Sequence, residues 1–76
     1  MPGRLTDTTG RVNHPEKITV YLSSDELLAL EQARLALRAE HGLAVDRGRI
    51  VRVALGLALT DLDAHGADSG LVKGLR

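Results

Sequence analysis

The chain has 76 residues, no Cys, Trp or Phe, and ten Lys and Arg residues against ten Asp and Glu residues. A chain this short buries only about 60% of its unfolded surface, and without cysteines neither disulfides nor thiolate metal sites supplement its core. A net charge of zero excludes a uniformly basic or acidic protein, and the longest apolar run, residues 53–59, is far shorter than the ~20 residues of a membrane span. We therefore expect one small cytoplasmic domain, without membrane contact, that gains stability by pairing with a second chain.

Residues 1–15 form the first distinct segment. They are polar, contain both prolines and show no hydrophobic periodicity, which is typical of a disordered arm. Arg4 and Arg11 make this arm a secondary candidate for contact with an anionic partner.

Residues 16–22 alternate strictly between polar and apolar side chains, which predicts one short β-strand. Its two faces carry Ile18, Val20 and Leu22 on one side and Lys17, Thr19 and Tyr21 on the other. A single strand cannot satisfy its own backbone hydrogen bonds, and the chain shows no second strand pattern. The simplest partner is the same strand of a second copy, paired antiparallel across a two-fold axis. The sequence therefore predicts a mostly α-helical fold with one short strand, built as an intertwined homodimer around a two-stranded intermolecular ribbon.

A first helix is predicted directly after the strand. Ser23 and Glu26 have the spacing of a capping box, in which the two side chains bond each other's backbone amides. The apolar stripe that follows predicts a helix over about residues 24–41, and Gly42 suits its C-terminal cap.

A second helix is predicted over about residues 47–64, with Asp46 as its N-cap. Its apolar residues cover more than one face, which again favours burial by a second chain. The Gly-rich residues 65–76 are predicted to be a flexible tail, so that the domain itself spans residues 16–64.

The sequence contains no recognisable catalytic or metal-binding group. The two serines before the first helix are explained as capping groups, and no His or carboxylate cluster has the spacing of metal ligands. No activated nucleophile or acid–base pair is visible. We therefore expect neither an enzyme nor a protein that needs a metal or cofactor.

Binding to double-stranded DNA is the function that the pattern favours. A two-stranded ribbon fits the major groove of B-DNA, which is about 12 Å wide, with the side chains of one face against the base edges. The base-reading role therefore falls on Lys17, Thr19 and Tyr21.

The start of the second helix is the expected phosphate site, formed by Arg47, Gly48 and Arg49. The unpaired amides of a helix start bind anions, and a glycine there lets a phosphate approach closely. Two arginines at this position are unfavourable against the helix dipole, so an external anion would explain them. Arg52 is a further secondary candidate.

This order of elements, with the segments Lys17–Ser23 and Asp46–Arg52, resembles the ribbon-helix-helix (Arc/MetJ/CopG) superfamily. The resemblance implies paired strands in the major groove and the second helix's N-terminus on the DNA backbone. It implies a bacterial transcriptional repressor or antitoxin-like autoregulator that acts on the nucleoid and associates further on DNA. The chain departs from the family pattern at Asp46, where Ser or Thr is common.

Several alternatives remain open. A nucleoid-associated or partition-type protein would bind DNA with little sequence preference. Arg47 and Arg49 could instead hold a signalling nucleotide, with Tyr21 stacking on its base. An antitoxin would also bind a toxin, for which only residues 66–76 are available, and a pure protein-interaction module would not touch nucleic acid.

Overall fold

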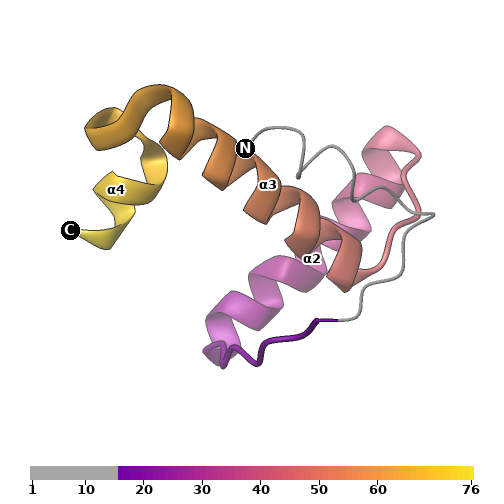
Figure 1. Ribbon diagram of the computed structural model, residues 1–76. Helices are drawn as coiled ribbons and strands as arrows, with labels where there is room; N and C mark the ends of the chain where they lie inside the picture. Colours follow the sequence, from indigo (N-terminus) through magenta and orange to yellow (C-terminus); the bar gives the residue numbers. More distant parts are fainter. Residues whose placement is uncertain (1–15) are drawn as a thin grey trace.

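The computed structural model describes residues 16–76, and the regular structure in this part of the chain is entirely helical (Figure 1). Helix α2 spans Ser24–His41 and helix α3 spans Arg47–His65; the one-turn 3₁₀ helix η1 spans Gly66–Asp68 and helix α4 spans Gly70–Leu75. Helix α3 meets α2 near its own beginning, and η1 turns the chain so that α4 lies against the end of α3 (Figure 1).

Helix α2 begins with the capping box that the sequence predicts. The Ser23 hydroxyl accepts a hydrogen bond from the Glu26 amide at 3.1 Å, and the Glu26 carboxylate accepts one from the Ser23 amide at 2.8 Å. The helix ends at Gly42, whose φ of +67° lies in the left-handed region that favours glycine. Both ends of the helix are therefore set by contacts within a few residues of one another.

Helix α3 begins at the predicted N-cap. The Asp46 carboxylate accepts a hydrogen bond from the Arg49 amide at 2.7 Å, which satisfies one of the unpaired donors of the helix start. The connector between α2 and α3 has only five residues, 42–46, so the end of α2 and the start of α3 are held close together.

The predicted strand over residues 16–22 is wrong, and so is the fold class that depended on it, the ribbon-helix-helix homodimer with an intermolecular ribbon. Residues 16–23 belong to no helix or strand, and the rest of the described chain is helix or short connector, so no second extended segment pairs with them. Alternation predicts which side chains share a face, but a strand exists only where its backbone groups meet a partner. Ile18 and Tyr21, from the two faces of the predicted strand, are 86% and 93% exposed, so neither face is covered by the described chain.

Residues 66–75 hold regular structure where the sequence predicts a flexible tail. The Asp61 carboxylate accepts a hydrogen bond from the Gly70 amide at 2.7 Å, which ties the start of α4 to α3. Ser69 is completely buried and caps α4 by accepting a hydrogen bond from the Val72 amide at 3.2 Å. The chain therefore folds back on itself at its C-terminal end.

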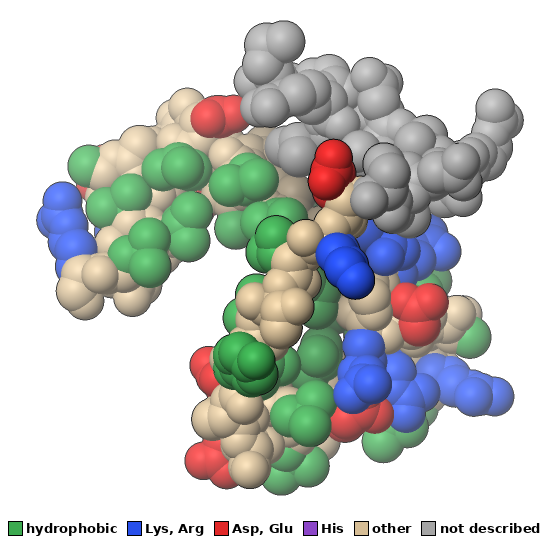
Figure 2. Space-filling view, turned by 60° about the horizontal axis from the view of Figure 1, so that its bottom comes forward, with side chains coloured by type: hydrophobic (Ala, Val, Ile, Leu, Met, Phe, Trp, Pro, Cys, Tyr) green, Lys and Arg blue, Asp and Glu red, His purple; other side chains and the backbone are tan. Residues whose placement is uncertain are grey.

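The described chain has no hydrophobic core of its own. None of its hydrophobic side chains is buried, and the partly buried ones lie where α2 meets α3 and where α3 meets α4. Figure 2 shows apolar side chains around a notch in the molecule, with many Lys and Arg side chains gathered on another side. Despite this apolar surface, none of the described helices is long and apolar enough to cross a membrane.

Candidate functional site

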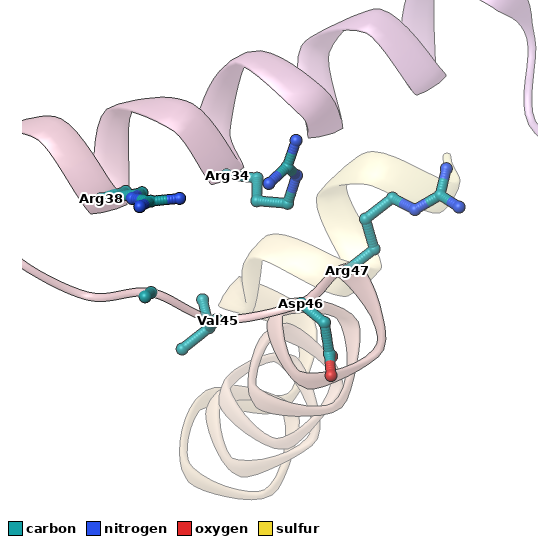
Figure 3. A pocket seen from close by; sticks show the side chains of 6 residues that line it. Arg34, Arg38, Val45, Asp46 and Arg47 are labelled. Carbon is teal, nitrogen blue, oxygen red and sulfur yellow. The ribbon is translucent and has the colours of Figure 1, made fainter.

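Three arginines from two helices line a hollow beside the connector of residues 42–46. Arg34 and Arg38 lie one turn apart on α2, and Arg47 is the first residue of α3. The hollow has a volume of about 370 Å³ and is lined by Arg34, Arg38, Ala44, Val45, Asp46 and Arg47. Figure 3 shows Arg34 and Arg38 on the side of α2 that faces the connector, while the Asp46 carboxylate points away from α2. We call this feature the arginine hollow.

Glu31 holds two of these arginines in position. One oxygen of its carboxylate accepts hydrogen bonds from Nε and Nη2 of Arg34, both at 3.1 Å, and the other lies 3.4 Å from Nε of Arg47. Because all three side chains are partly exposed, these ion pairs add little stability, and their effect is to orient the guanidinium groups. Arg38 forms no ion pair with any of residues 16–76, so its charge is available to a ligand.

The predicted phosphate site at the start of α3 is partly filled by the chain itself. Of the three predicted residues, Arg49 already donates its amide to Asp46 at 2.7 Å. The amides of Arg47 and Gly48 have no hydrogen-bond partner among residues 16–76. Two of the three predicted amides are therefore open to an anion, and an acidic side chain lies beside them.

Gly48 also leaves room for a neighbouring side chain. A Cβ atom at this position would lie 3.2 Å from Nη1 of Arg52 and 3.4 Å from Oδ1 of Asp46. The space beside Gly48 is therefore held by the Arg52 guanidinium, and the missing side chain lets this arginine lie over the start of α3. Arg52, a secondary candidate from the sequence, thus joins the positive charge at this end of the molecule.

The predicted base-reading residues lie apart from the arginine hollow. Lys17, Thr19 and Tyr21 are exposed in the irregular segment before α2, and none of them lines the hollow. Arg4 and Arg11 lie outside the residues that the structure describes.

Arg34 and Arg38 line the hollow but are not among the residues that the sequence singles out. Both belong to a helix whose acidic side chains outnumber its basic ones, so the summed charge of the helix conceals them. Their spacing of four residues was the available signal, because side chains four apart share one face of a helix. That this face meets the start of α3 depends on how the two helices pack.

The arrangement is suited to bind an anion with several oxygen atoms, such as a phosphate group. Guanidinium groups donate paired hydrogen bonds that match phosphate oxygens, and the open helix amides add further donors. Residues 16–76 contain no group of three or more His, Cys, Asp or Glu side chains placed to hold a metal ion. In comparisons with known proteins, the chain matches no family model, no curated protein and no solved structure.

Proposed function

We propose that the protein binds double-stranded DNA through the arginine hollow and acts as a transcriptional regulator, either a repressor or an antitoxin-like autoregulator. The observation that carries the proposal is that Arg34 and Arg38 of α2 and Arg47 of α3 line one hollow. Phosphate contacts supply most of the affinity of a protein for DNA, and arginine is well suited to make them.

An extended anion fits this surface better than a small phosphorylated ligand. The positive charge continues from the arginine hollow along the start of α3 to Arg52, so it follows a surface instead of closing around one molecule. A nucleotide site would also need a partner for the base, and the aromatic candidate Tyr21 does not line the hollow. A signalling nucleotide is therefore the weaker proposal.

Sequence preference requires contacts with base edges, because phosphate contacts carry no sequence information. Lys17, Thr19 and Tyr21 are exposed and remain the candidates for this role. Without them the protein would be a nucleoid-associated or partition-type protein with low sequence preference, which is the second candidate function.

We further propose that the protein acts as a homodimer in the cytoplasm, on the nucleoid. Because no hydrophobic side chain of residues 16–76 is buried, the described chain leaves much of its apolar surface for a partner to cover. A second copy doubles the positive charge presented to DNA, and further association on DNA would extend it. An antitoxin-like autoregulator would differ from a repressor in that it also binds a toxin.

The test is binding of the full chain to random-sequence duplex DNA at 50 and 200 mM salt, with the dissociation constant measured by fluorescence anisotropy. Affinity should fall about 40-fold for three phosphate contacts and about 2000-fold for six, because each contact releases counterions. Protection of discrete sites would favour a repressor, and uniform coverage would favour a nucleoid-associated protein. Absence of binding at 50 mM salt would refute the proposal.

Replacing Asp46 by Ser should strengthen DNA binding about threefold to tenfold. Serine keeps an N-cap oxygen for the start of α3, while the change removes a negative charge beside the phosphate site, where a charge pair at about 4 Å is worth about 1 kcal/mol in water. The control is Asp68→Ser, which removes the same charge from η1, away from the hollow. Equal affinities for the two variants would mean that the start of α3 is not near DNA.

A further inference from the structure

Gly56 lies in the middle of α3, where a glycine weakens a helix relative to alanine. Its backbone does not require glycine, because only Gly42 and Gly66 have positive φ among the described residues. Nor do close neighbours require it, since a Cβ atom at Gly56 would meet nothing within 4 Å. Nothing in the described chain therefore accounts for a glycine at this position.

Apolar side chains flank Gly56 on both sides of α3. At 3.6 residues per turn, Val53 and Leu59 flank Gly56 on its two sides, each about 60° around the helix, and Arg52 and Thr60 lie one turn before and after it. Leu55 and Leu57 lie further around the helix, about 100° from Gly56. Val53 and Leu57 are 55% and 68% exposed. A position without a side chain, flanked by Val53 and Leu59, lets another helix approach closely.

We propose that α3 of one copy packs antiparallel on α3 of a second copy, with Gly56 of each chain at the two-fold axis. This inference rests on the proposed homodimer and names its contact. Around such an axis each glycine faces its own counterpart. Neither helix then has a side chain at the axis, so the two backbones can approach closely. Val53 of one helix then lies against Leu59 of the other.

The charges along α3 fit an antiparallel pair. Residues equally far before and after Gly56 meet across the axis, so Arg49, seven residues before it, faces Asp63, seven residues after it. Both lie on the same stripe of the helix as Gly56, and neither side chain forms an ion pair within residues 16–76. A parallel pair would bring each arginine against its own copy, so the charges select the antiparallel orientation.

Arg49 therefore has a different partner from the one that the sequence predicts. In the dimer it pairs with Asp63 of the second copy, and the arginine hollow remains available to DNA. An exposed ion pair adds little affinity, and its contribution is to orient the two helices.

The test is sedimentation velocity of the full chain and of its Gly56→Ala and Gly56→Leu variants. Both substitutions raise helix propensity, so any loss of association cannot come from loss of the helix, which circular dichroism would confirm. We expect the dissociation constant of the dimer to rise about tenfold for Ala and about 100-fold or more for Leu, because both overfill the contact. The matched control is Gly74→Ala, another helical glycine with open space around it, which should leave the dimer unchanged.

Charge reversal supplies a second, independent arm. Arg49→Asp and Asp63→Arg should each weaken association, and the double variant should restore it, because the opposite charges again face one another. A dimer that Gly56→Ala leaves unchanged or tightens overturns the proposed contact while leaving the homodimer itself in place. If the chain is monomeric at about 100 µM, both the contact and the homodimer are overturned. This concentration is on the order of 100 times a micromolar dissociation constant. DNA binding is tested separately by the salt dependence above.

Discussion

Replacing both Arg38 and Arg47 by Ala is expected to lower the affinity for duplex DNA about 100-fold. Each arginine would make a charge-assisted hydrogen bond to phosphate worth roughly 1.5 kcal/mol, and 1.4 kcal/mol corresponds to about a tenfold change in affinity. The slope of log affinity against log salt should fall by about 2, because two fewer counterions are released. Fluorescence anisotropy titrations at several salt concentrations measure both quantities.

The fold should tolerate this double change. Both side chains are exposed, and the ion pair of Arg47 with Glu31 spans 3.4 Å on the surface, so the thermal midpoint should move little. The matched control is Lys73→Ala with Arg76→Ala, which removes the same charge from α4 and the chain end. If both double variants lose the same affinity, binding depends on total charge only, and the arginine hollow is not the DNA site.

Replacing Asp61 by Ala is expected to release α4 from α3. The Asp61 carboxylate accepts a hydrogen bond from the Gly70 amide at 2.7 Å, and its other oxygen lies 2.7 Å from Nδ1 of His65. Without this carboxylate the turn through the buried Ser69 loses its anchor. Amide hydrogen exchange over residues 70–75 should become about tenfold faster or more, since this hydrogen bond ties the first residue of α4 to α3.

The same contact predicts a pH dependence. The hydrogen bond from the Gly70 amide, followed by that with His65, lowers the pKa of Asp61 below its ordinary value of 3.8. Because the pKa is lowered in the folded chain, the ionised Asp61 carboxylate contributes fully to holding α4 above pH 3.8. This contribution is lost as the pH falls through the lower pKa of the folded chain. Protection of α4 should therefore stay constant from neutral pH down to about pH 5 and decrease only below about pH 4.

Asp61→Asn separates the charge from the hydrogen bond. The amide oxygen of asparagine can still accept from Gly70, so α4 should keep part of its protection, now without the decrease at acid pH. If Asp61→Ala leaves the exchange of residues 70–75 unchanged, α4 is held by its apolar contacts with α3 and the carboxylate is dispensable.

The sequence alone determined the ends of the two long helices. The capping box of Ser23 and Glu26, the N-cap of Asp46 and the left-handed Gly42 act through hydrogen bonds or dihedral angles that span only a few residues. Such contacts form whatever the rest of the chain does, so residue type and spacing are sufficient to predict them.

Only the tertiary structure decided the remaining features. The strand pattern of residues 16–22 has no partner within the described chain, and a strand cannot be formed by side-chain alternation alone. The fold-back of α4 depends on an Asp61–Gly70 contact across nine residues, and the arginine hollow depends on how α2 meets α3. Contacts of this kind require chain segments to meet in space, and their geometry is set by packing that no local pattern encodes.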